Sequence, residues 1–120
     1  MTFSATPGSS IRSDALYLAD ILDSIEAIER FVAGFDEARF LSDELVQSAV
    51  LQKLSVIGEA AARVSDSTRC DFAEIPWKEV ISFRNVAVHA YFSVDWRIVF
   101  VTVKDDLPAV KLAISARTRS

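Results

Sequence analysis

Apolar residues recur at spacings of three and four over two long segments of the chain. The first segment begins near Ser13, and its apolar positions are Leu18, Ile21, Leu22, Ile25, Ile28 and Val32. The second follows Ser42, and its apolar positions are Leu45, Val46, Ala49, Val50, Leu54, Ile57, Ala61 and Val64. This spacing places apolar side chains on one face of an α-helix, with polar side chains opposite. The pattern therefore predicts two long amphipathic helices.

Small and polar residues mark the expected ends of these helices. Gly34 is typical of the residue that follows a helix C-terminus. Ser42 comes before two acidic residues, and a capping hydroxyl followed by acids predicts the start of the second helix there. Residues 36–41 predict a short helical turn between the two. Gly58 falls inside the second helix, where glycine costs about 1 kcal/mol relative to alanine, so we expect another backbone to pack closely against it.

Polar breaks and shorter helical segments follow the second helix. Residues 65–74 are polar and predict a loop. Pro76 suits the first position of a third helix, because its missing N–H would be unpaired there anyway. This helix is expected to end between Tyr91 and Val94, and Asp95 is expected to cap the next one.

The stretch 96–103 is ambiguous in its local pattern. Its β-branched and aromatic residues favour a strand by propensity, but its apolar residues also fit helical spacing and a lone strand would have no partner. We therefore predict a helix, and a last helix that begins at Pro108. Residues 1–12 include a run rich in Ser, Thr, Pro and Gly and predict a flexible lead-in. The predicted fold over 13–120 is a single all-α domain, an up-and-down bundle of four to five helices.

Composition narrows the class of protein. The 120 residues carry a net charge of −4, which argues against a large basic face for nucleic acid but not against a small RNA site. Cys70 and His89 are the single cysteine and the single histidine, so no internal disulfide and no Cys/His zinc site can form within one chain. The cysteine usage suits a reducing cytoplasm. The N-terminus has no signal-peptide pattern, and no membrane span is expected.

The candidate functional residues lie close together in the segment 82–92. It is mostly apolar, yet it contains Arg84, Asn85, His89 and Tyr91. An unpaired arginine in a core would be costly, so these groups are expected to face a polar partner or to form a site. On a helix, at about 100° per residue, the four side chains cover an arc of roughly 160°, which one groove or one partner surface can reach.

Structural interpretations of the same residues remain open at this point. A lone histidine on a helix is more often structural than catalytic. Arg84 has Glu59 and Glu79 as possible ion-pair partners, and Tyr91 could be a buried aromatic residue with its hydroxyl at the surface. Other catalytic patterns are weak, because the chain has neither a Gly-x-Ser-x-Gly elbow nor a glycine-rich phosphate loop.

The order Arg-Asn, three residues, His, one residue, Tyr resembles the signature of the HEPN superfamily, and within it the HepT-like ribonuclease toxins of HepT/MntA-type toxin–antitoxin systems. Further segments of the chain resemble the family in the same order, and these are 20–30, 56–61, 74–77, 91–95 and 106–108. The resemblance extends over about residues 14 to 115. It implies a HEPN-like helical bundle that pairs as a homodimer and brings two motif helices together around a cleft.

The resemblance also implies a function. HepT-like proteins are metal-independent endoribonucleases without a cofactor, so RNA is the expected substrate. Arg84 would stabilise the charged phosphorane, His89 would act as general acid and base, and Asn85 would orient the phosphate or His89. The matching tyrosine of the family is AMPylated by a cognate minimal nucleotidyltransferase antitoxin, and that modification would fall on Tyr91.

Two alternatives from other classes are retained. The protein could be a non-catalytic helical subunit that docks a nucleotidyltransferase or a nucleotide through the same segment. It could also be a stand-alone interaction module in which the polar segment is buried and structural. Loss of RNA cleavage in an Arg84→Ala variant would distinguish the enzyme from both.

Overall fold

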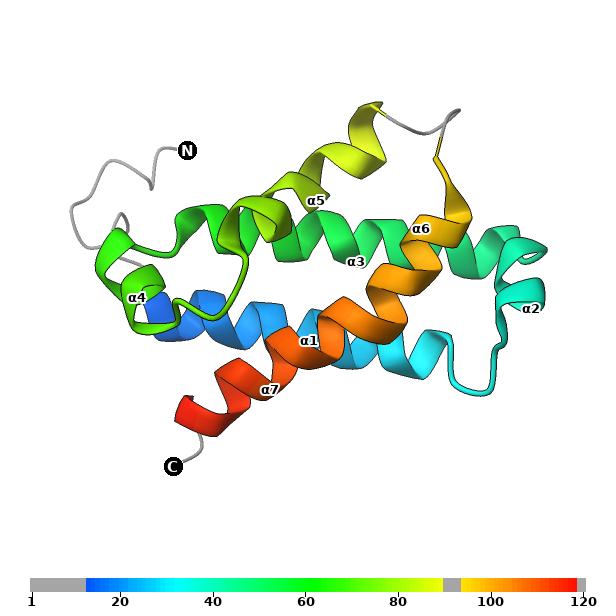
Figure 1. Cartoon of the computed structure of the whole chain (residues 1–120). Helices are drawn as coiled ribbons and strands as arrows, with labels where there is room; N and C mark the ends of the chain where they lie inside the picture. The colour runs from blue at the N-terminus through cyan, green and yellow to red at the C-terminus, as the bar shows by residue number, and fades with distance from the viewer. Residues whose placement is uncertain (1–12, 90–93, 119–120) are drawn as a thin grey trace.

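The computed structural model describes residues 13–89 and 94–118, with side chains for 13–85 and 94–117. All regular structure in these ranges is helical, which confirms the all-α prediction. The elements, drawn in Figure 1, are α1 (Asp14–Phe31), α2 (Glu37–Leu41), α3 (Glu44–Arg63), α4 (Asp66–Asp71), α5 (Trp77–His89), α6 (Trp96–Val101), the π-helical turn η3 (Thr102–Asp106) and α7 (Leu107–Thr118). None of the described helices is long and apolar enough to cross a membrane.

The two predicted amphipathic helices, α1 and α3, lie side by side in opposite directions at the centre of the bundle (Figure 1). α5 packs along α3, and α7 packs against α1. The core fills the space between these helices, and its largest fully buried side chains are Phe40, Ile21, Ile25, Ile28, Ile57, Leu107, Ile114, Val50 and Val80. Burying such apolar surface is the main favourable contribution to folding.

Helix starts are capped by side chains, with one correction to the sequence prediction. The Asp43 carboxylate accepts a hydrogen bond from the Val46 N–H at 3.0 Å, so Asp43 rather than Ser42 caps α3. Ser42 instead ends α2, and its hydroxyl donates to the Arg39 carbonyl at 3.1 Å. A charged acceptor makes the stronger cap at the positive end of a helix. Asp95 caps α6 as predicted, through the Arg97 N–H at 3.0 Å.

The segment 65–74 is not simply a loop, because it contains α4. Ser65 caps this short helix, and its hydroxyl also donates to Asp14 at 2.6 Å. The Thr68 hydroxyl donates to the same carboxylate at 2.5 Å. These hydrogen bonds, Ser65 first, hold the pKa of Asp14 below its ordinary value. The contacts join residues more than fifty positions apart, so a local reading of the sequence could not include them.

The chain from Trp96 to Thr118 is helical throughout, which confirms a helix over 96–103. No break precedes a separate last helix at Pro108, however, because α6, η3 and α7 follow one another directly. The π turn ends immediately before the first turn of α7, which contains Pro108. Proline lacks a backbone N–H and its ring crowds the preceding turn of a helix, and the widened π turn lies at that place.

Two predictions about chain ends fall outside the described residues. The flexible lead-in over 1–12 is one, and the end of the third helix between Tyr91 and Val94 is the other, since α5 is described only through His89. Gly34 does follow the last turn of α1 as predicted, with a φ of 78° that glycine adopts without strain.

Candidate functional site

The motif helix α5 lies along α3, and this packing positions the candidate residues (Figure 1). Arg84, Asn85 and His89 all belong to α5. The side chain of His89 and the whole of Tyr91 lie outside the described residues, so their roles stay predictions. Trp77 anchors the start of the helix, because its indole N–H donates to the carbonyls of Arg69 and Phe72 at 3.2 and 3.1 Å.

Gly58 on α3 lies directly against the backbone of α5. A Cβ atom built there would lie 2.9 Å from the Ile81 carbonyl oxygen and 2.9 Å from the Arg84 Cβ. Both separations are too short for a real methyl group, so only glycine fits against this turn of α5. The prediction that another backbone packs on Gly58 is confirmed, and that backbone is the one that carries Arg84.

Arg84 is held at the surface of the bundle rather than in its core. Its Nη1 lies 3.8 Å from Oε1 of Glu59, and the two side chains are 41% and 53% exposed. Glu59 is thus a partner of Arg84, as one of the structural interpretations anticipated. An ion pair of this length and exposure contributes little to stability, about 0–1 kcal/mol, so the guanidinium remains available to a second anion. Asn85 beside it is exposed.

A second arginine reaches the same carboxylate. Nη2 of Arg63 lies 3.8 Å from Oε1 of Glu59, four residues earlier on α3. Two guanidinium groups, one from α3 and one from α5, therefore converge on one oxygen atom. Sequence reasoning missed Arg63, although its i, i+4 spacing from Glu59 is a signal for a helical ion pair. No group of three His, Cys, Asp or Glu side chains within the described ranges could hold a metal ion.

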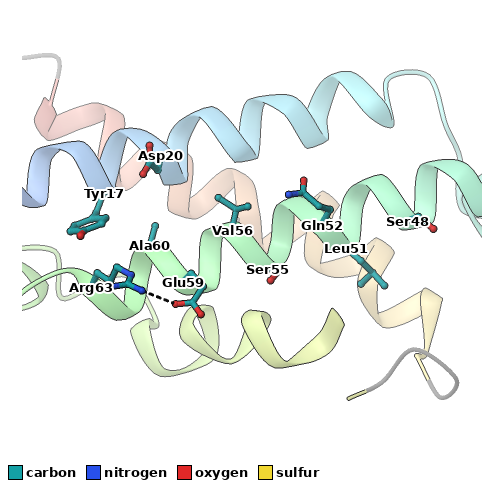
Figure 2. Close-up of a pocket in the computed structure, with 10 residues that line it drawn as sticks. All are labelled: Tyr17, Asp20, Ser48, Leu51, Gln52, Ser55, Val56, Glu59, Ala60 and Arg63. Carbon is teal, nitrogen blue, oxygen red and sulfur yellow. Dashed lines mark ion pairs between the residues drawn. The ribbon is translucent and has the colours of Figure 1, made fainter. Parts of the chain in front are cut away.

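A hollow of about 490 Å³ opens beside this cluster, between α1 and α3. Figure 2 shows the side chains that line it, which are Tyr17, Asp20, Ser48, Leu51, Gln52, Ser55, Val56, Glu59, Ala60 and Arg63. Tyr17 from α1 and Arg63 from α3 lie at the same end of the hollow (Figure 2). The sequence alone does not predict this hollow, because the hollow depends on how α1 and α3 face each other.

Comparison with known proteins identifies the family of the chain. The family model described as "Ribonuclease HepT-like" matches residues 21–116, a range that contains Glu59, Arg63 and the whole segment 82–92. The chain belongs to the ribonuclease HepT-like family. This confirms the resemblance stated from the sequence, together with the HEPN-like helical fold and the expected class of protein, a ribonuclease.

Relatives of the HepT-like chain carry ribonuclease names. "Probable ribonuclease HepT" of Thermococcus cleftensis is 41% identical over 100 residues, which is 83% of this chain and 91% of the relative. "Putative RNase MJ1380" of Methanocaldococcus jannaschii is 33% identical over 102 residues, 85% of this chain and 94% of the relative. "Putative RNase TTE0752" of Caldanaerobacter subterraneus is 30% identical over 95 residues, 79% of this chain and 85% of the relative. No solved structure matches the chain at a significant level.

Proposed function

We propose that this protein is an endoribonuclease that cleaves RNA without a metal ion. The observation that carries the proposal is the half-exposed guanidinium of Arg84, presented by the motif helix of a HepT-like chain and paired, among the described residues, with Glu59 at a long distance. An RNA phosphate carries the same charge as a carboxylate and can accept the fork of guanidinium donors. Phosphate therefore replaces Glu59 as the partner of Arg84 when RNA binds.

The proposed reaction is an internal transfer of the phosphoryl group. The 2′-hydroxyl attacks the adjacent phosphorus, and His89 accepts its proton as general base. The bond to the 5′-oxygen of the next nucleotide breaks, and that oxygen takes up a proton from the imidazolium of His89, which returns to its neutral form. Arg84 stabilises the additional negative charge of the phosphorane, and Asn85 orients the phosphate or His89. The products are a 2′,3′-cyclic phosphate and a 5′-hydroxyl.

RNA cleavage by the purified full chain, with EDTA present, tests this function. We expect wild-type protein to cut single-stranded RNA and to leave cyclic phosphate ends that mass spectrometry identifies. Arg84→Ala and His89→Ala are each expected to lower the rate by about 10²–10⁴-fold, as loss of a charge stabiliser or a general acid/base does. Unchanged cleavage in both variants, or cleavage only after Mg²⁺ is added, would contradict the mechanism.

We further propose that the protein is the toxin of a toxin–antitoxin pair whose partner is a minimal nucleotidyltransferase. The partner would transfer AMP from ATP to the Tyr91 hydroxyl and release pyrophosphate. The added phosphate is an anion that competes with RNA for arginine. The support is the sequence motif, in which the tyrosine follows the histidine by two positions.

Intact mass of the protein after co-expression with the cognate nucleotidyltransferase tests the control mechanism. We expect a gain of one or more AMP units and a loss of RNA cleavage, with neither effect in a Tyr91→Phe variant. AMPylation that leaves RNA cleavage unchanged would overturn the proposed regulation. A protein that binds the nucleotidyltransferase but never cleaves RNA would instead support the alternative of a non-catalytic binding subunit.

A further inference from the structure

The hollow between α1 and α3 has the composition of a ligand site. Its volume of about 490 Å³ lies within the range of small-molecule pockets in proteins, roughly 300–1,000 Å³. Leu51, Val56 and Ala60 give it an apolar floor, while Ser48 and Gln52 add hydroxyl and amide groups. Such a surface favours a flat, largely apolar molecule with hydrogen-bonding edges.

One wall of the hollow is aromatic. Tyr17 projects from α1 toward α3, at the end where Ala60 and Arg63 lie (Figure 2). Proteins that bind single-stranded RNA stack unpaired bases on aromatic rings and on arginine planes. Tyr17 and Arg63 supply both kinds of surface at one end of the same hollow.

Glu59 connects the hollow to the motif helix. It lines the hollow, and its Oε1 lies 3.8 Å from both Arg63, also at the rim, and Arg84 on α5. A phosphate bound by Arg84 would therefore lie directly beside the mouth of the hollow. The base of the next nucleotide on the same strand could then enter the hollow on the side of α1.

We propose that this hollow holds an unpaired base of the RNA substrate, with the neighbouring phosphate between Arg63 and Arg84. The inference rests on the proposed ribonuclease function and assigns it a base-binding subsite outside the motif helix. Base recognition here explains how an acidic chain of net charge −4 binds RNA at a small site rather than along a basic face.

Amide chemical shifts of the full chain, recorded while AMP is added, test the subsite independently of cleavage. We expect AMP to shift residues of α1 and α3 that line the hollow, whereas ribose 5-phosphate, which lacks the base, shifts them at least tenfold less at equal concentration. No shift by AMP, or equal shifts by both ligands, would overturn the proposal.

Two substitutions in the lining of the hollow, together with one control variant, test whether AMP binds in the hollow. Gln52→Trp fills the hollow from an exposed position, and Tyr17→Leu removes the stacking ring. Both are expected to weaken AMP binding at least fivefold. Leu45→Trp adds the same ring on α3 outside the hollow, at a side chain that is 81% exposed, and is expected to leave binding unchanged. Equal binding by all three variants would overturn the assignment.

A 2′-O-methyl oligoadenylate, which cannot be cleaved, distinguishes RNA from a free nucleotide. We expect it to shift the hollow and the residues around Arg84 together, and Gln52→Trp to reduce both effects. Shifts with AMP but none with the oligonucleotide would overturn the RNA subsite and leave a free-nucleotide site. If wild-type protein cleaves no RNA at all, the proposed function fails, while the AMP titration still decides whether the hollow binds a base.

Discussion

Glu59 forms an ion pair with each of the two arginines of the candidate site, Arg63 and Arg84. Its carboxylate lies 3.8 Å from Arg63 and from Arg84, and all three side chains are between 41% and 61% exposed. Because the charges are solvated, the ion pairs add little to folding stability. Under the proposed function, the carboxylate would instead compete with an RNA phosphate for the two guanidinium groups.

A Glu59→Gln substitution tests this competition. Removing the negative charge is expected to lower the KM for RNA roughly threefold to tenfold, which corresponds to the about 1 kcal/mol of an exposed ion pair, while kcat changes less than threefold. Steady-state cleavage kinetics measure both constants. The matched control is Glu59→Asp, which keeps the charge and should leave KM within twofold. A higher KM in Glu59→Gln would contradict the role.

The contacts of Asp14, unlike those of Glu59, bear on stability. Hydrogen bonds from Ser65 and Thr68 lower its pKa below the ordinary value of 3.8. Because the folded pKa is lowered, the stabilisation is present above the unfolded value and is lost as the pH falls through the folded value. Asp14 is therefore expected to stabilise the fold at neutral pH and to stop doing so in strong acid.

An Asp14→Asn variant makes this measurable. Its free energy of unfolding is expected to be about 1 kcal/mol lower than wild type at pH 7, an exposed charge-assisted interaction being discounted for solvent. The difference should shrink as the pH falls below 3.8. Urea unfolding between pH 7 and pH 3 gives these values, and Asp23→Asn, at an exposed position of the same helix, is the control. A difference that is constant with pH would contradict the assigned cause.

At the scale of elements, the contact between α3 and α5 determines where the motif lies. Gly58 allows the backbone of α5 to approach α3, and Val80 on α5 is buried. A larger side chain at this position would meet the Ile81 carbonyl and Arg84, so Gly58 permits the observed spacing between the helices. Arg84 and Glu59 lie across this same interface.

A Gly58→Ala variant distinguishes close packing from helix propensity. Propensity alone predicts a gain of about 1 kcal/mol, whereas an added methyl group in a packed contact costs about 1–3 kcal/mol. We expect the packing cost to dominate, so that the midpoint of urea unfolding falls and RNA cleavage falls with it. Ser55→Ala, which raises propensity on the same helix without a clash, is the control for the unfolding measurement alone, because Ser55 also lines the hollow. A more stable Gly58→Ala protein would contradict the contact.

At the scale of the whole molecule, one protomer offers few cations to RNA. The chain has 17 acidic and 13 basic residues, and the candidate site contains two of the basic ones, Arg63 and Arg84. A symmetric pair of protomers that brings two α5 helices together would double this positive charge at one place. This is the physical reason to expect the homodimer that the family resemblance implies.

Sedimentation equilibrium of the purified chain tests the dimer. We expect a mass of twice 13.3 kDa at micromolar concentration, and we expect cleavage per protomer to fall when dilution separates the pair. Activity that is proportional to concentration across the dissociation range would show that one protomer suffices. A monomer at high micromolar concentration would contradict the dimer itself.

The helical content, the two central helices and the family could be predicted from the amino-acid sequence. These follow from patterns that repeat along the chain, since the apolar stripes of α1 and α3 are periodic and the Arg84–Asn85–His89 order lies within one helix. The start of α5 next to Pro76 and the cap at Asp95 were predictable for the same local reason. The prediction of a helix over 96–103 also depended on the absence of a partner strand.

Tertiary structure alone decided the features that join distant parts of the chain. The convergence of Arg63 and Arg84 on Glu59, the hollow between α1 and α3, and the helix α4 held by Asp14 all depend on which helix faces face each other. Helix periodicity predicts which side chains share one face of a helix. It does not predict against which other helix that face packs. That choice is made by the packing of the whole core, and the candidate site lies along α3, which packs against both α1 and α5.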